Sequence, residues 1–173
     1  TLMRASENNH LEIVKLLLLD NADVNLQDEA GSTALMFASS KGYLEIVELL
    51  LFHDADVNLL NKAGSTTLMR ASENNHLEIV KLLLSHNANV NLQNKFGSTA
   101  LIRASSKGYL VIVEQLLSHD ADANLQDEDG YTALTIPSRK DQLEIVKLLL
   151  SYKANVNLQN KFEIGRASCR ERV

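Results

Sequence analysis

Apolar positions along the chain predict pairs of short α-helices. In one segment the apolar residues cover too wide an arc for a helix with a single solvent-facing side, namely at Leu44, Ile46, Val47 and residues 49–51. We expect such a helix to be buried between neighbours. A shorter apolar segment precedes each of these helices, and a threonine at its start can accept hydrogen bonds from the free N–H groups of the first turn. These threonines are Thr33, Thr66, Thr99 and Thr132.

The helix pair recurs with a period of 33 residues. Nearly identical motifs begin at Gly31, Gly64, Gly97 and Gly130, and they read GSTAL, GSTTL, GSTAL and GYTAL. A second motif follows each of them, as in LEIVELLL from Leu44, and then a third, as in ADVN from Ala55. With these motifs at this period, the chain resembles the ankyrin repeat family over residues 1–162. The resemblance implies an all-α solenoid of stacked helix-turn-helix units joined by hairpin loops, in which one repeat cannot fold alone.

The period divides the chain into repeats at 28–60, 61–93, 94–126 and 127–159, with partial repeats at 1–27 and 160–162. Thr1 corresponds to Thr67, one residue inside a first helix, so we interpret the chain as a fragment that lacks its own start. The repeat pattern ends after Phe162. The last ten residues, IGRASCRERV, resemble the translation of a sequencing adaptor, and we therefore interpret residues 163–173 as a non-native tail.

The chain departs from the family pattern at three places. Where the family ends its second helix with glycine, this chain has Asn21, Asp54, Asn87, Asp120 and Lys153. Asn and Asp tolerate a left-handed backbone conformation better than Lys does. The family's histidine in the first helix is missing, and we expect somewhat weaker coupling between repeats. Pro137 lies inside the first helix of the fifth repeat, which we expect to be kinked or short.

Charges on the second helices alternate in sign along the stack, from Lys15 through Glu48, Lys81 and Glu114 to Lys147. Alternation of this kind predicts ion pairs between neighbouring repeats, each contributing roughly 0 to 1 kcal/mol. Within single helices we also expect favourable pairs three residues apart, which are Glu12 with Lys15, Glu78 with Lys81, and Glu144 with Lys147.

Composition excludes several classes of protein. The formal net charge of the 173 residues is −5, which is the wrong sign for a general nucleic-acid binder. The longest apolar runs, such as 16–19, are far shorter than the roughly 18 residues of a membrane span. A single cysteine cannot close an intramolecular disulfide, which favours an intracellular setting, cytoplasmic rather than nuclear. We expect a monomer.

Catalytic and metal-binding residues are not indicated. His53, His86 and His119 recur with the repeat and have acids nearby, but equivalent residues of stacked repeats lie about 8 to 10 Å apart. A zinc ion needs all of its ligands within about 2 Å, so we interpret these histidines as solvated loop residues. His10 and His76 lie in the turn between helices, where packing explains them. We expect neither an enzyme active site nor a cofactor.

The family resemblance implies that partners meet a concave strip, formed by the hairpin tips and the outward side of the first helices. Carried over to this chain, the strip has ten basic and five acidic residues, a net charge of +5, against −11 for the remaining residues up to 162. Aromatic side chains between the charges suit anchors at an interface. The candidate partner-binding residues are Arg4, Phe37, Lys41, Lys62, Arg70, Lys95, Phe96, Arg103, Lys107, Tyr131, Arg139 and Lys140.

The sequence therefore predicts a non-catalytic protein–protein interaction scaffold that binds an acidic protein segment on this strip. Another interpretation of the same charges is that they are merely solvated. Another function compatible with the pattern is the recognition arm of a larger multidomain enzyme, such as a kinase or a ubiquitin ligase. Nucleic-acid binding through the strip is disfavoured, because the acidic remainder of the chain opposes approach.

Overall fold

The structure, a computed structural model, describes residues 1–161 of the chain. These residues form ten α-helices and no strand. The helices follow one another in pairs: α1 (Leu2–Glu7) with α2 (Leu11–Leu19), α3 (Ala34–Lys41) with α4 (Leu44–Phe52), α5 (Thr67–Glu73) with α6 (Leu77–Ser85), α7 (Ala100–Lys107) with α8 (Leu110–Ser118), and α9 (Thr135–Arg139) with α10 (Leu143–Ser151). The predicted all-α stack of helix pairs is confirmed.

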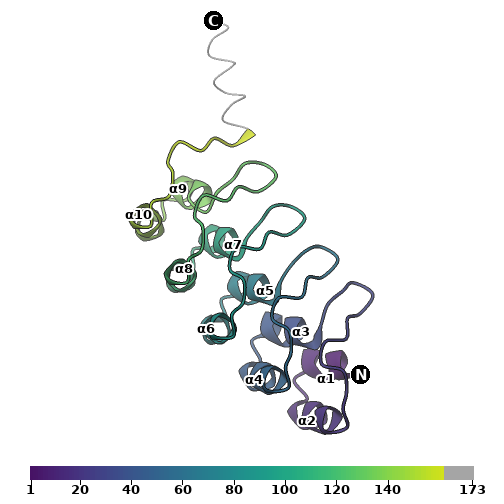
Figure 1. Cartoon of the computed structure of the whole chain (residues 1–173). Helices are drawn as coiled ribbons and strands as arrows, with labels where there is room; N and C mark the ends of the chain where they lie inside the picture. Colours follow the sequence, from purple (N-terminus) through teal and green to yellow (C-terminus); the bar gives the residue numbers. More distant parts are fainter. Residues whose placement is uncertain (162–173) are drawn as a thin grey trace, which may run out of the picture.

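Two rows of helices run the length of the stack (Figure 1). The first helix of every pair lies in one row and the second helix in the other. Long loops join one pair to the next, and they project from the row of first helices on the side away from the second helices. Each pair packs against the pairs before and after it, which is the arrangement of a solenoid.

Three of the four predicted threonine caps are confirmed. The hydroxyl of Thr33 accepts a hydrogen bond from the Met36 N–H at 3.2 Å. Thr66 and Thr99 bind the N–H groups three residues ahead in the same way, at 3.2 and 3.1 Å. Each hydroxyl satisfies one of the four N–H groups that have no partner within the helix, so the start of the helix is fixed by the sequence.

The cap predicted at Thr132 is wrong. Its hydroxyl accepts from the N–H of Leu134 at 3.3 Å instead, and α9 begins only at Thr135. Pro137 explains the late start, because it has no N–H to donate to the carbonyl of Ala133 and its ring would clash with that carbonyl. With α9 beginning at Thr135, Pro137 lies in the first turn, where no such bond is needed. The predicted shortening of this helix is confirmed.

The second helices end on left-handed residues, as predicted. Asn21, Asp54, Asn87, Asp120 and Lys153 all have φ between 59° and 63°. The alanine that follows each of them donates its N–H back to a carbonyl of the last turn, for example from Ala55 to Leu50 at 3.1 Å. This bond satisfies a carbonyl that the helix leaves free.

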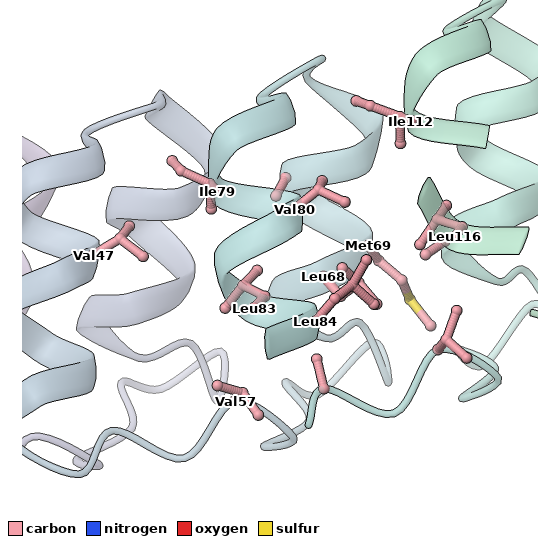
Figure 2. Close-up of a cluster of buried hydrophobic side chains, with 14 of the residues drawn as sticks. Val47, Val57, Leu68, Met69, Ile79, Val80, Leu83, Leu84, Ile112 and Leu116 are labelled. Atoms are coloured by element: carbon pink, nitrogen blue, oxygen red, sulfur yellow. The ribbon is translucent and has the colours of Figure 1, made fainter. Parts of the chain in front are cut away.

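The apolar core is continuous along the stack. Figure 2 shows Val47, Leu83 and Leu116 from three successive second helices, with Leu68 and Met69 of α5 beside them. These five side chains are essentially inaccessible to solvent. Each second helix between two others is thus buried on both sides, as the width of its apolar arc predicts.

Hydrogen bonds between neighbouring loops also join the repeats. At the hairpin tips, the N–H of Lys62 donates to the carbonyl of Ala30 at 2.8 Å, and that of Lys95 donates to Ala63 at 3.0 Å. At the base of the loops, the Asn25 side chain accepts from the Asp56 N–H at 2.8 Å, and equivalent bonds repeat at Asn58, Asn91 and Asn124. The sequence did not indicate these bonds, which join neighbouring repeats in addition to the packing of their helices.

The predicted ion pairs between repeats are wrong. Lys15, Lys81 and Lys147 bind the glutamates of their own helices, at 2.7, 2.9 and 2.9 Å, as the spacing of three predicts. Within residues 1–161, none of them pairs with Glu48 or Glu114. The helix itself fixes the distance between residues three apart, whereas the gap between stacked helices is about 8 to 10 Å.

Candidate functional site

The predicted strip has two edges in the structure. One edge is the row of hairpin tips, which carries Lys62, Lys95, Phe96 and Tyr131. The other is the row of first-helix ends, which carries Lys41, Lys107, Arg139 and Lys140. Between the edges lie Arg4, Phe37, Arg70 and Arg103, on the first helices themselves. A first helix of eight residues spans about 12 Å, so the two edges are separate places at which a partner can be bound.

The hairpin tips are held by their own side chains. Asn61 accepts hydrogen bonds through its Oδ1 from the N–H groups of Ala63 and Ser65, at 3.0 and 2.9 Å. This turn leaves Lys62 exposed to solvent. The same geometry at Asn94 leaves Lys95 and Phe96 exposed, with 63% of Phe96 accessible. Tyr131 is half-buried in the next hairpin.

The three arginines of the first helices differ in their surroundings. The guanidinium of Arg103 binds the carboxylate of Glu73 on the preceding repeat, and only 19% of its side chain is accessible. Arg4 binds Glu7 of its own helix at 3.1 Å and is largely exposed. Arg70 is half-buried and makes no ion pair within residues 1–161. Of the three, Arg70 is therefore the cation available to a partner.

Phe37 occupies the position in α3 that corresponds to these arginines, and it is half-buried. At the helix-end edge, the structure brings three cations together, which are Lys107 of α7, Arg139 at the end of α9 and Lys140, which follows it. Lys41 is exposed at the end of α3, apart from them. Ser106 and Ile136, which the sequence pattern did not indicate, lie among these cations.

Ion pairs with acidic residues of the strip itself leave its net charge unchanged but reduce the number of cations that are free for a partner. Arg4 and Arg103 are paired as described, and Lys161 lies 4.0 Å from Asp129. Within residues 1–161, the strip cations that make no ion pair are Lys41, Lys62, Arg70, Lys95, Lys107, Arg139 and Lys140. Residues 162–173, which include the predicted non-native tail, lie outside the described residues.

The recurring histidines complete their own helices. The Nδ1 atoms of His53, His86 and His119 lie 2.9, 2.8 and 2.8 Å from a carbonyl oxygen of the preceding turn. His76 packs beneath Gly42, with its Nε2 3.2 Å from the Ser40 carbonyl. In the described part of the chain, no group of three or more His, Cys, Asp or Glu residues is placed to hold a metal ion. None of the helices in that part has the length and apolar character needed to cross a membrane.

Comparison with known proteins agrees with this architecture. A family model described as ankyrin repeats (3 copies) matches residues 2–94 and again residues 86–160. A search of curated proteins finds no match.

Proposed function

Because the chain belongs to the ankyrin repeat family, whose repeats generally serve as protein–protein interaction modules, we propose that it is a non-catalytic scaffold binding a protein partner along the strip. The observation that carries this proposal is the set of strip cations without an ion pair. They lie at the hairpin tips, on the first helices and at the ends of these helices, whereas the chain as a whole has a net charge of −5. Charge of one sign on one face favours a partner of the opposite sign.

An acidic protein segment fits the strip best. Such a segment can pair with Arg70 between the edges and with Lys62 and Lys95 at the tips. Phe96 adds an exposed aromatic ring beside these cations, and aromatic residues commonly supply much of the binding energy at interfaces. The bonds between neighbouring tips order the loops before binding, which lowers the entropy lost when a partner docks.

Peptide selection provides a test with defined ligands. Peptides selected from a displayed random library against the chain should be enriched in Asp and Glu. For one such peptide, the double variant Lys62→Glu with Arg70→Glu should raise the Kd by more than tenfold and flatten its dependence on salt. Fluorescence anisotropy measures both quantities. Arg103 is unsuitable for this test, because a glutamate there would face Glu73 and disturb the fold.

The matched control reverses the same number of charges on the row of second helices, with Lys81→Glu and Lys147→Glu. Both lysines lie on second helices and bind only glutamates of their own helix. Their reversal should leave the Kd within about twofold. Equal losses from both double variants, or enrichment of peptides that are not acidic, would contradict binding on the strip.

A further inference from the structure

A cavity of about 460 Å³ lies at the helix-end edge of the strip, between α7 and α9. It is lined by Ser106, Lys107, Ile136, Arg139 and Lys140. The three cations are exposed to solvent, whereas Ser106 and Ile136 are half-buried. The cavity thus combines a partly apolar floor with a basic rim.

The cavity follows from the unusual first helix of the fifth repeat. α9 has 5 residues where α7 has 8, because Pro137 delays its start. It packs less closely against α7 than α5 does. In addition, Ile136 stands where the preceding repeat has Arg103, whose long side chain fills the corresponding interface between α5 and α7 by reaching Glu73. The shorter side chain leaves that space open.

The charge of this interface is also unlike that of the others. Arg139 occupies the position that Glu7 and Glu73 hold in α1 and α5, and Lys140 occupies that of Asn8 and Asn74. Elsewhere a glutamate from this position binds an arginine of the strip, as Glu7 binds Arg4 and Glu73 binds Arg103. None of the five residues that line the cavity is acidic, so its three positive charges are not balanced within it.

Hydrogen-bond donors around the cavity remain free for a ligand. The Nζ of Lys140 donates one hydrogen bond to the Ser106 carbonyl at 2.9 Å, which leaves two of its three N–H groups. The same bond covers a carbonyl at the end of α7 that would otherwise repel an anion. Lys107 and Arg139 make no ion pair within residues 1–161.

We propose that this cavity binds the phosphoryl group of a phosphorylated serine or threonine in a protein partner. This inference rests on the proposed function, since it names the group that one end of the strip recognises. A phosphoryl group carries a charge of about −1.5 to −2 and three acceptor oxygens, which match three cations better than the single charge of a carboxylate does. The cavity also has room for the adjoining carbon atoms of the side chain, which contact Ile136.

The experiment uses N-acetyl-phosphoserine amide as the probe, with amide chemical shifts of the whole chain followed by NMR at constant ionic strength. Saturable shifts should be confined to the amides of residues 106–108, 136 and 138–141, since Pro137 has no N–H. N-acetyl-glutamate amide should bind at least tenfold more weakly, and inorganic phosphate should also bind more weakly because it lacks the contact with Ile136. Equal binding of the glutamate probe or of inorganic phosphate, or shifts that do not saturate, would overturn the proposal.

Two double variants separate this inference from the function on which it rests. Arg139→Gln with Lys140→Gln should raise the Kd for phosphoserine by about tenfold or more, and circular dichroism should show unchanged helix content. The control, Lys62→Gln with Arg70→Gln, removes the same charge elsewhere on the strip and should leave phosphoserine binding unchanged. Equal effects of the two variants on the Kd would overturn the proposal, because they would show that phosphoserine responds to the positive charge of the whole strip and not to this cavity. Loss of acidic-peptide binding in the control alone bears on the proposed function and not on this cavity.

Discussion

Single residues decide whether the polar groups buried in the core of each repeat have hydrogen-bond partners. Thr67 is fully buried at the start of α5, and no residue in the described part of the chain makes a hydrogen bond to its hydroxyl. The equivalent residues of the repeats that begin at 28, 94 and 127 are Ala34, Ala100 and Ala133. Four serines of the first helices share this condition, at Ser6, Ser39, Ser72 and Ser105. A buried hydroxyl without a partner costs about 1 to 3 kcal/mol of stability.

Two adjacent threonines therefore should respond to the same substitution with opposite signs. Thr67→Val keeps the shape of the side chain and removes the unsatisfied hydroxyl, so the free energy of unfolding should rise by about 1 kcal/mol. Thr66→Val removes the hydroxyl that caps α5 and should lower it by about 0.5 to 2 kcal/mol. Urea denaturation measures both changes. A loss of stability in both variants would show that the Thr67 hydroxyl has a partner after all.

A second residue-scale feature is Leu60, which has no side-chain amide at a position where the other hairpins have glutamine. At the equivalent position, the Gln27 amide donates to the carbonyls of Gly31 and Leu60, at 2.7 and 3.0 Å. Gln93 and Gln126 bridge their neighbouring hairpins in the same way. Leu60 cannot donate, and its side chain is exposed. The hairpin it belongs to is therefore joined to the next one by fewer bonds.

Leu60→Gln should restore the bridge to the carbonyls of Gly64 and Gln93. We expect a gain of about 1 kcal/mol, which corresponds to roughly 2 to 4 °C in the melting temperature of a chain of this size. Gln27→Leu, the reverse change at an equivalent hairpin, should lower the melting temperature by a similar amount. Calorimetry of the two variants checks the prediction, which fails if Leu60→Gln brings no gain while Gln27→Leu brings a loss.

At the scale of elements, α9 shows how one residue reshapes a helix. The start of α9 is moved to Thr135, and its N-cap residue Leu134 makes no side-chain cap hydrogen bond. The Thr135 hydroxyl instead accepts a hydrogen bond from the N–H of Thr132, which precedes the helix, at 3.1 Å. The shortened helix leaves the cavity beside α7. Pro137 is therefore responsible both for the shortest of the first helices that the structure describes and for the opening at that edge of the strip.

Pro137→Ala should lengthen α9 toward Ala133, where its counterpart in α7 begins at Ala100. We expect a gain of about 1 to 3 kcal/mol, because the restored N–H can bind the Ala133 carbonyl. Hydrogen exchange should show new protection at the amide of residue 137. Unchanged stability together with an unprotected amide would mean that the pair of Thr132 and Thr135 fixes the start of α9 independently of the proline.

The sequence predicted those features that depend on local geometry. The helix pairs, three caps, the left-handed helix ends and the short α9 all follow from residue types at fixed spacing. The spacing also predicted the ion pairs within a helix, but it could not predict which long side chains pair across an interface between repeats. Arg103 pairs with Glu73 across an interface, whereas Lys81 pairs within its helix, because reach and stacking distance decide between them. The cavity beside α9 depends on the same distances. The sequence predicted only that Pro137 would kink or shorten the helix beside it.

At the scale of the whole molecule, the position of a helix in the stack determines its burial. α6 and α10 have the same sequence, LEIVKLLLS. Leu84 of α6 is buried, whereas its equivalent Leu150 in α10 is 44% exposed. The reason is that α6 packs against both α4 and α8, and α10 packs against α8 alone among the second helices that the structure describes. Stability should accordingly be distributed as a sum of interfaces between neighbours.

These identical helices allow a matched test of that distribution. Leu83 of α6 and Leu149 of α10 are equivalent residues, and both are completely buried. Leu83→Ala should lower the free energy of unfolding by about 2 to 5 kcal/mol, because it weakens an interface on each side of α6. Leu149→Ala should instead loosen the fifth repeat ahead of the others, so that amides of 143–151 lose protection from hydrogen exchange while those of α4 and α6 keep theirs. Urea unfolding followed by circular dichroism should then show a broadened transition for Leu149→Ala and a shifted one for Leu83→Ala. If both variants shift one sharp transition equally, the chain unfolds as a single cooperative unit and nearest-neighbour interfaces do not govern its stability.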